Sequence, residues 1–454
     1  MKSLCQFSIH PFIGRCIATA LTGLVLLTLP GMAAGAGQDA KELPAAVRWV
    51  LNDVGRLIDQ KNYDGAVQRL TEFQAKGGTV PQHTADDDVH HHPMVYFALG
   101  NCRLYQERYD QAEAALSQAV RRQPDLTAAW LNLAKACYEQ GKHAVAADHF
   151  REAYDRSAEK QPEHLYYSAA ADLMAKKYKK AIRTFEKLFE RHPGQIQMAW
   201  KAHWVHALLA DGQAKRALPH IEALIAGHTG EERVRWQEVL LYQYVQLKMT
   251  AKARSYARAL TRETPAEPRW WKLSAQLDLS DGAYADALAA MTIYGYLTPL
   301  SAEEQKLWAD LSLQLGIPGQ AAPVYEKMLT SAADAQGMKQ MLKNLVTAYR
   351  RLGRPEAALA QLDRAPDLGK DPELLMLRAD LLYEQKRYDE ASAAYLRAAR
   401  EDHARAGNAW LMAGYAAWQA NDINASRQAF ARAADFKPHR QKALLAMRQL
   451  PKVN

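Results

Sequence analysis

One motif recurs about every 34 residues along this chain of 454 residues, and the repeat constrains the fold more than any other feature of the sequence. In each copy, a small residue is followed four positions later by a large, often aromatic, residue. Alignment on the small residue gives eleven copies, at Ala66, Ala112, Ala146, Ala181, Ala217, Ala253, Ala287, Ala321, Ala358, Ala391 and Ser426. Successive copies lie 33 to 37 residues apart, except for the first two, which are 46 apart. The sequence therefore predicts eleven stacked units, with an insertion of about a dozen residues after the first.

The spacing within each copy predicts a pair of amphipathic helices. If the aligned small residue is numbered 20, positions 4, 7, 8 and 11 lie on one face of a first helix, and positions 20, 24 and 27 lie on one face of a second. In the third copy these faces include Trp130, Leu133 and Ala134, then Ala146 and Phe150. A helix pair cannot bury these faces alone, so neighbouring pairs are expected to stack. Position 15, where the chain turns, is glycine in five copies: Gly141, Gly212, Gly282, Gly316 and Gly353.

This pattern resembles the tetratricopeptide repeat family, in which a large residue stands at position 4, Leu at 7, Gly or Ala at 8, Ala at 20 and an aromatic residue at 24. The resemblance covers nearly all of residues 47–440. It implies an all-α fold, a right-handed superhelical solenoid of about eleven helical hairpins. Copies one, five and six match least well, because position 24 holds Leu70, Ile221 and Ala257.

The repeat phase divides the chain into five segments. Residues 1–36 precede the repeats, residues 37–78 form an N-terminal helical repeat, residues 79–92 form a His/Asp-rich insertion loop, and residues 93–440 form the main array. Residues 441–454 are expected to form a capping helix and a tail, with Leu444, Leu445 and Met447 on the apolar side of the helix.

The first 36 residues have the pattern of a secretory signal peptide. Lys2 and Arg15 are their only Lys or Arg residues, residues 17–29 are an almost uninterrupted apolar run, and Ala34-Gly35-Ala36 forms a cleavage site. We expect cleavage after Ala36 and export, which places the protein in the periplasm if the cell is Gram-negative. The alternative is an uncleaved anchor in the inner membrane, and in both cases the bulk of the chain lies outside the cytoplasm.

Export changes the interpretation of the charge and the cysteines. The whole chain has a formal net charge of +8; for an exported chain, nucleic acid is a poor partner, and an acidic protein or an anionic polymer of the cell envelope is a better one. Of the four cysteines, Cys102 and Cys137 remain after cleavage. They fall at positions 10 and 11 of adjacent first helices, where two buried free thiols are favoured over a disulfide.

The sequence holds no enzyme motif, so we expect neither catalysis nor a cofactor. The insertion loop concentrates potential metal ligands, namely His83, Asp86, Asp87, Asp88, His90, His91 and His92. Imidazole and carboxylate groups bind zinc, copper or nickel. Neighbouring ligands on one loop lack the fixed geometry of a structural site, however, so a solvated loop is the favoured interpretation.

The family resemblance implies that partners bind a concave surface lined by first-helix positions 2, 5, 9, 12 and 13. By this rule, an aromatic wall near the N-terminus contains Phe97, Asn101, Tyr138 and Tyr166, and a second one contains Tyr383, Tyr415 and Trp418. Between the two walls, position 5 is a lysine in three consecutive copies, Lys272, Lys306 and Lys343, with Arg269, Arg350 and Arg351 nearby. These cations either bind an acidic peptide or pair with Glu303, Asp310 and Glu373, which the same rule selects.

A second resemblance suggests a biological setting. Residues 287–328, with Tyr296-Leu297-Thr298-Pro299-Leu300 and Leu315-Gly316-Ile317-Pro318, are similar to exported tetratricopeptide proteins encoded beside TonB-type energy-transducing systems. The resemblance implies a periplasmic scaffold, peripheral to the cell envelope, that engages components of the TonB system or outer-membrane receptors. The lysines at position 5 suggest that the bound protein or peptide has an acidic segment. Two alternatives are a scaffold for polysaccharide export or outer-membrane assembly, and a protein that binds an anionic polymer such as peptidoglycan.

Overall fold

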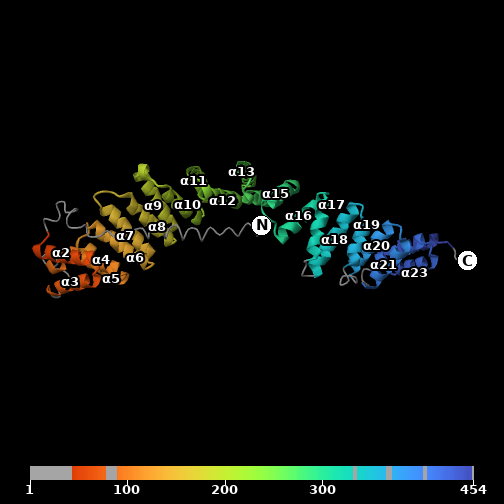
Figure 1. Cartoon of the computed structure of the whole chain (residues 1–454), viewed down its shortest axis with the longest axis horizontal. Helices are drawn as coiled ribbons and strands as arrows, with labels where there is room; N and C mark the ends of the chain where they lie inside the picture. Colours follow the sequence, from red (N-terminus) through yellow and green to blue (C-terminus); the bar gives the residue numbers. More distant parts are fainter. Residues whose placement is uncertain (1–42, 78–88, 331–334, 365–370, 402–405, 452–454) are drawn as a thin grey trace. The chain divides into compact units, whose positions relative to one another are not determined.

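The computed structural model describes residues 43–77, 89–330, 335–364, 371–401 and 406–451. Every regular element in these ranges is a helix (Figure 1). None of the helices in the same ranges is both long and apolar enough to cross a membrane. The predicted signal peptide lies outside the described residues, and so do His83 and the other insertion residues up to 88.

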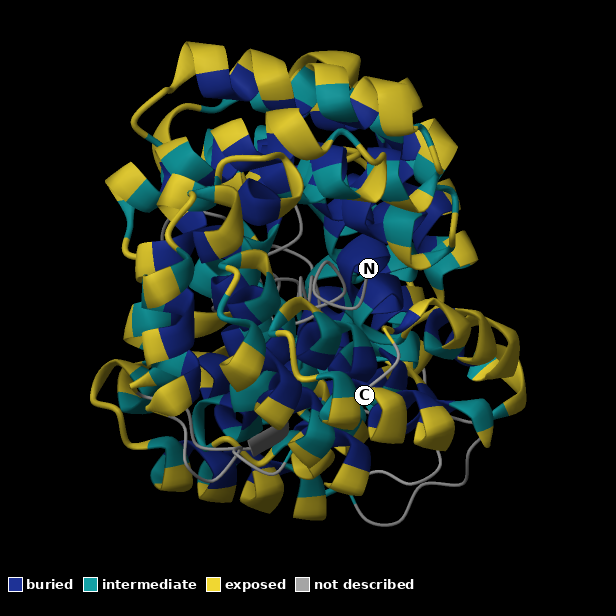
Figure 2. Ribbon diagram, turned by 90° about the vertical axis from the view of Figure 1, so that its right-hand side faces the viewer, coloured by how far each residue is buried: buried dark blue, intermediate teal, exposed yellow. Residues whose placement is uncertain are grey.

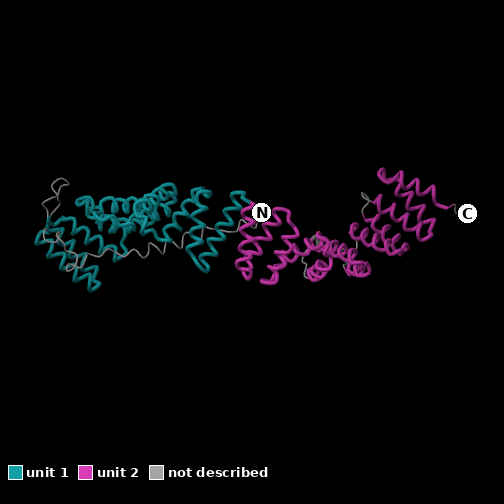
Figure 3. Tube along the Cα trace, turned by 90° about the horizontal axis from the view of Figure 1, so that it is seen from above, with its two compact units in different colours: residues 1–249 teal, residues 250–454 magenta. Residues whose placement is uncertain are grey.

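The first of two compact units, residues 1–249, contains five helical hairpins and a final single helix in its described part (Figure 3). The hairpins are α2 (Ala45–Asp59) with α3 (Tyr63–Ala75), α4 (Pro93–Tyr105) with α5 (Tyr109–Arg122), α6 (Thr127–Glu139) with α7 (His143–Arg156), α8 (Pro162–Met174) with α9 (Tyr178–Arg191), and α10 (Met198–Ala210) with α11 (Ala214–Gly227). The single helix is α12 (Gly230–Gln246), and the short 3-10 helices η3 (Val89–His91) and η4 (Pro193–Gln195) precede α4 and α10.

The second unit, residues 250–454, begins with the single helix α13 (Thr250–Glu263) and continues with five hairpins. These are α14 (Pro268–Ser280) with α15 (Tyr284–Leu297), α16 (Ala302–Gln314) with α17 (Pro318–Leu329), α18 (Ala335–Arg351) with α19 (Pro355–Asp363), α20 (Pro372–Glu384) with α21 (Tyr388–Glu401), and α22 (Ala406–Gln419) with α23 (Ile423–Ala434). Helix α24 (Lys437–Gln449) closes the unit. Ten of the eleven predicted helix pairs therefore lie within one unit, and the boundary between the units falls between α12 and α13, in the sequence of the sixth repeat, one of those that match the repeat pattern least well.

The turn inside each helix pair has one residue in the left-handed region, always at position 15. Five of these residues are the predicted glycines, with φ between 66° and 78°. The other six are not glycine: Lys61, Glu107, Lys176, Lys248, Lys386 and Asn421, with φ between 56° and 65°. The turn geometry is thus the same in all eleven pairs, although L side chains adopt this conformation at a cost.

The cores consist of the predicted repeat positions. In the second repeat, Ala112, Leu116 and Ala119 at positions 20, 24 and 27 are fully buried, and Figure 2 shows how buried residues lie on the inward faces of the helices. In this repeat, position 8 must be small, because a Cβ on Gly100 would overlap the Leu116 side chain. This close approach lets the two helices of a hairpin pack against each other.

Two boundaries differ from the sequence prediction. Residues 89–91 of the expected insertion loop form η3. The C-terminal helix begins at Lys437, because Pro438 lies in its first turn, where a missing N–H costs nothing. Its buried face is formed by Ala443 and Ala446, and Met447 packs against the same core as predicted. Leu444 and Leu445 are 44% and 50% exposed, so the prediction was wrong for these two residues.

Candidate functional site

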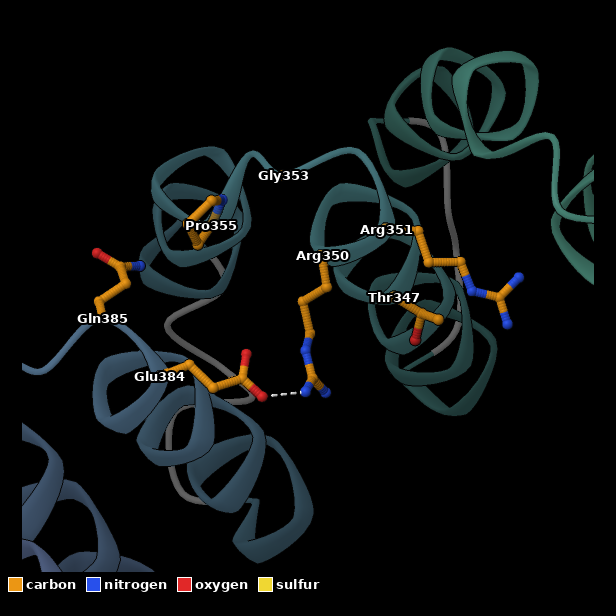
Figure 4. Close-up of a pocket in the computed structure, with 7 residues that line it drawn as sticks. All are labelled: Thr347, Arg350, Arg351, Gly353, Pro355, Glu384 and Gln385. Carbon is orange, nitrogen blue, oxygen red and sulfur yellow. Dashed lines mark hydrogen bonds and ion pairs between the residues drawn. The ribbon is translucent and has the colours of Figure 1, made fainter.

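A cavity of about 510 Å³ lies among α18, α19 and α20 of the second unit (Figure 4). Its lining residues come from the end of α18, the turn after it, the start of α19 and the end of α20: Thr347, Arg350, Arg351, Gly353, Pro355, Glu384 and Gln385. Thr347, Arg350 and Arg351 hold positions 9, 12 and 13 of the ninth repeat, and Glu384 holds position 13 of the tenth. The cavity therefore opens on the first-helix surface that the family resemblance selects for partner binding.

The charges in the cavity are paired across two repeats. Arg350 and Glu384 point toward each other and form an ion pair (Figure 4). Their side chains are 39% and 50% exposed, so the pair is open to solvent. Arg351 points away from this pair and donates a hydrogen bond to the backbone carbonyl of Leu313. Of the two arginines, Arg350 is thus the one that pairs with an acidic side chain of the cavity.

The three lysines at position 5 each have a carboxylate partner. Lys272 lies 2.9 Å from Glu304, Lys306 lies 2.6 Å from Asp310, and Lys343 lies 3.2 Å from Glu373. The hydrogen bond that Lys272 donates to Glu304 raises the pKa of Lys272. Two of these three partners, Asp310 and Glu373, are those that the sequence suggested, and the third is Glu304 instead of Glu303. The predicted cationic row is neutralised by neighbouring acids in this structure.

The predicted site residue Arg269 also has an acidic partner. Its Nε donates a hydrogen bond to Glu267 over 2.8 Å. Glu267 is the N-cap residue of α14, and its side chain also accepts a hydrogen bond from the backbone N–H of Arg269. The guanidinium of Arg269 is thereby held at the start of the helix.

Three of the four residues in the predicted N-terminal aromatic wall are buried. Phe97 and Asn101 on α4 are 1% exposed, and Tyr166 on α8 is 4% exposed. Asn101 accepts a hydrogen bond from Asn132 on α6 over 2.7 Å. The hydroxyl of Tyr166 lies 2.9 Å from His203 Nδ1 on α10. These side chains pack between the first helices of successive repeats, so the prediction of an exposed wall was wrong for these three residues. The fourth residue, Tyr138, is half-buried, and its ring lies 4.7 Å from that of His143.

The second aromatic wall remains partly accessible. Tyr383, Tyr415 and Trp418 are half-buried. Burial raises the pKa of Tyr383, and the nearby Tyr388 and Tyr415 raise it further. Tyr415 packs on Phe430 at 5.0 Å between ring centroids. Since Tyr383 and Glu384 are adjacent on α20, this wall continues from the cavity toward the C-terminus.

The histidines of the insertion that the structure describes contact aromatic rings or cap a helix, and they do not converge on one point as metal ligands do. The ring of His90 lies 4.7 Å from that of Phe73, and the ring of His91 lies 6.0 Å from that of Tyr96. His92 caps α4 by accepting a hydrogen bond from the backbone N–H of Met94. No group of three or more potential ligands gathers anywhere in the described part of the chain. The fourth candidate, His83, is outside that part.

Cys102 and Cys137 are both buried and free, as the sequence favoured. Burial raises the pKa of each thiol to about 12. Reactive cysteines carry lowered pKa values, so these two thiols have the properties of core residues.

The sequence analysis missed the acidic half of the cavity. Glu384 at position 13 and Thr347 at position 9 both satisfy the rule for groove positions, and applying it evenly to repeats nine and ten would have selected them. Buried ion pairs were also missed: Asp172 and Asp278, both at position 11, lie 3.1 Å from Arg151 and 2.8 Å from Arg254. The signal was an acid at a position where the pattern expects a large apolar residue.

Comparison with protein families decides the nature of the repeat. The family described as "Tetratricopeptide repeat" matches residues 97–162, 343–402 and 376–440. Residues 97–162 and 343–440 of the chain are therefore tetratricopeptide repeats. Such repeats are typical of non-catalytic scaffolds for protein–protein interaction, and the cavity lies within the matched segment 343–402. No curated protein matches the chain as a whole.

Solved structures similar to this tetratricopeptide chain are distant. A tetratricopeptide repeat protein from Parabacteroides merdae is 14% identical, with a TM-score of 0.32, over 67% of this chain and 100% of its own. YrrB, described as a tetratricopeptide protein with an unusual peptide-binding site, is 20% identical, with a TM-score of 0.33. The match covers 42% of this chain and 97% of YrrB. A chain of the complex of Naa15 and Naa10 bound to HypK-THB is 14% identical, with a TM-score of 0.35, and the match covers 88% of this chain and 70% of that chain.

Proposed function

We propose that this protein is an exported, non-catalytic scaffold that binds an acidic segment of a partner protein through the first-helix surface of repeats nine to eleven. The observation that carries the proposal is the cavity beside Arg350, which lies at groove positions and whose lining residue Glu384 directly follows Tyr383 on α20. An arginine near half-buried aromatic side chains suits a peptide with a carboxylate and apolar neighbours.

Binding proceeds by exchange of carboxylates. In the free protein Arg350 is paired with Glu384, and both side chains are substantially exposed. Exposed ion pairs of this kind contribute only about 0–1 kcal/mol, so a partner carboxylate can replace Glu384 at little cost. The guanidinium can then bind the partner with two parallel hydrogen bonds. Tyr383, Tyr415 and Trp418 contact the adjacent apolar side chains of the partner.

The arrangement of charges favours a peptide over a long anionic polymer. A polymer such as peptidoglycan would need a continuous row of cations, but Lys272, Lys306 and Lys343 are each paired with an acid. A peptide needs only one carboxylate at the cavity. The short, interrupted pattern of charge therefore fits a local acidic segment.

The setting that we propose is the periplasm, where the protein is peripheral to the membranes of the cell envelope. The apolar run in residues 17–29, followed by the Ala34-Gly35-Ala36 site, supports export. The similarity of residues 287–328 to tetratricopeptide proteins encoded beside TonB-type systems supports a role in TonB-dependent transport. The partner would then be a component or receptor of that system.

Site-specific photocrosslinking in the native cell tests this function. A photoreactive amino acid replaces Gln385 at the cavity and, in a matched control, Gln428, which is exposed on the second helix α23 of the same unit. We expect adducts with an exported envelope protein from position 385 only, and fewer of them when Arg350→Gln is added. Equal adducts from both positions, or adducts with cytoplasmic proteins only, would contradict the proposal.

A further inference from the structure

Helix α15 has large apolar residues on its outward face, where the other second helices of the described ranges have polar or small residues. Its exposed residues include Ile293, Tyr296 and Leu297, which are 36%, 86% and 40% exposed. They occupy positions 26, 29 and 30, and Ala289, also exposed, occupies position 22. These positions follow helical spacing, so the four side chains form one stripe along the helix.

The same positions in another repeat show how unusual this stripe is. In α9, positions 22, 26, 29 and 30 hold Arg183, Lys187, Glu190 and Arg191. Such charged faces are the rule for a helix that meets water. Among the second helices of the described ranges, α15 has large apolar residues at all of positions 26, 29 and 30. An exposed row of this kind marks an interaction site more often than a surface without function.

A basic helix borders the stripe on one side. Helix α13 is tied to α15 by Arg258, which donates to Asp286 over 2.6 Å. The basic residues of α13 are Lys252, Arg254, Arg258 and Arg262, against one acid, Glu263. Arg262 has the same repeat position as Tyr296, and both are exposed. An exposed positive charge therefore accompanies the aromatic end of the stripe.

We propose that the outward face of α15 is a second docking site, whose occupant is a short amphipathic helix of a partner with acidic residues along the flank that faces α13. The apolar stripe would cover the apolar face of that helix, and Arg262 would attract its acidic flank. This site lies on a second helix, whereas the cavity at Arg350 lies on first-helix positions. The scaffold would thus hold two partners on separate surfaces.

The dimensions of the stripe favour this occupant over a second copy of the chain. A helix of 14 residues is about 21 Å long and about 10 Å wide, a footprint of about 200 Å². Stable protein–protein interfaces bury about 800 Å² on each partner. The area of the stripe therefore matches that covered by one helix lying on another, and it is smaller than the area that a stable interface with a second copy of the chain would need.

The acidic residues around the stripe disfavour a membrane surface. Glu303 follows the end of α15 and is exposed, whereas Asp281 and Asp286 near its start form ion pairs with Arg254 and Arg258. An anionic bilayer is broad and would meet the Glu303 carboxylate, whereas a single helix is narrow enough to lie beside it. Charge complementarity therefore selects an acidic helix.

Fluorescence anisotropy on the full-length protein tests the proposal. The probe is a labelled, designed 14-residue helical peptide with Leu on one face and Glu on one flank, and a second probe carries Lys in place of Glu. We expect Ile293→Ser combined with Tyr296→Ser to weaken binding of the Glu probe at least about tenfold, by loss of apolar contact. The matched control is Val145→Ser, which removes a side chain that is 44% exposed on α7 and should leave binding unchanged.

The charge half of the proposal has its own variant. Arg262→Glu should weaken binding of the Glu probe and strengthen binding of the Lys probe. All these residues are exposed, so circular dichroism should show unchanged helicity for every variant. The proposal is overturned if the double variant binds the Glu probe as tightly as the parent, or if both probes bind equally well.

Two further outcomes would identify another occupant and also overturn the proposal. One is co-sedimentation with phosphatidylglycerol vesicles that the double variant abolishes, without any binding of the Glu probe by the parent. The other is concentration-dependent self-association, measured by analytical ultracentrifugation, that the same variant abolishes.

Discussion

Residues in the left-handed region at the eleven turns differ in how easily they adopt that conformation. Glycine adopts it without strain, whereas an L residue pays about 1 kcal/mol or more. We predict that Glu107→Gly raises the free energy of unfolding by about 1 kcal/mol, because Glu107 has φ 57°. Gly141→Ala should lower it by a similar amount, because a Cβ at Gly141 meets no atom within 4 Å and the cost is purely conformational.

Urea unfolding followed by circular dichroism measures both changes. The two variants serve as controls for each other, since they make opposite changes at equivalent positions of adjacent repeats. Changes of the same sign would show that contacts, and not backbone conformation, decide stability at these turns.

Two buried histidines on α10 make stability depend on pH. Burial lowers the pKa of His203 to about 4, and burial together with the nearby His203 lowers the pKa of His206 to about 3, against an ordinary value of 6.5. Both are neutral when folded but take up protons when unfolded below about pH 6.5. The stabilisation is therefore complete above pH 6.5 and is lost as pH falls toward 4, by roughly 3 kcal/mol for His203 alone.

Urea titrations at several pH values between 7 and 4 check this prediction. His203→Gln keeps a side chain that can bond to the hydroxyl of Tyr166 but does not titrate, so it should flatten the decline. An equally steep decline in this variant would assign the pH dependence to other groups.

At the scale of the element, the small residue at position 8 sets how closely the two helices of a hairpin approach. In α22, a Cβ on Gly414 would lie 2.5 Å from the ring of Phe430 on α23. We predict that Gly414→Ala lowers the free energy of unfolding by about 1–3 kcal/mol through overpacking. Gly55→Ala in α2 is the matched control, because nothing lies within 4 Å of its Cβ, and it should raise stability by about 0.5–1 kcal/mol.

Thermal unfolding followed by circular dichroism compares the two alanine variants. A Gly414→Ala protein that melts at or above the temperature of the Gly55→Ala protein would contradict the packing assigned to position 8.

The helices and turns were predictable because they depend on local sequence. Ala112, Leu116 and Gly141 have roles that follow from spacing alone. The exposure of groove positions was not predictable in the same way, since it depends on the next repeat. Tyr166 is buried because His203 and Trp200 of α10 cover it, whereas Lys272, at the same position 5, keeps its ammonium group at the surface. The sequence pattern also could not show which carboxylate each cation selects.

At the scale of the whole molecule, the chain consists of two units, and the boundary between them falls in the sequence of the sixth repeat. Position 24 of that repeat is Ala257, where the pattern expects a large residue to fill the space between hairpins. Stability in repeat arrays is approximately a sum of repeat terms and nearest-neighbour terms. A repeat that lacks its large residue is therefore a natural boundary, and the sequence had already marked it as one of the weakest copies.

Both proposed binding surfaces lie in the second unit. The cavity beside Arg350, the aromatic residues after it and the apolar face of α15 all belong to residues 250–454. The predicted wall of the first unit is largely buried, so that unit contributes mainly packing in the described residues. Recognition of the partner's acidic segment therefore depends on one ion pair, that between Arg350 and Glu384.

Binding of a labelled acidic peptide to four proteins tests that central claim most directly. The proteins are the parent, Arg350→Gln, Glu384→Gln and the control Arg432→Gln, which removes an exposed arginine from α23. We expect Arg350→Gln to weaken binding at least about tenfold and Glu384→Gln to strengthen it several-fold, since that change frees the guanidinium. The control should bind like the parent, and raising the salt to about 0.5 M should weaken binding by all proteins that retain Arg350. Equal affinities for the parent, Arg350→Gln and Arg432→Gln would contradict the account.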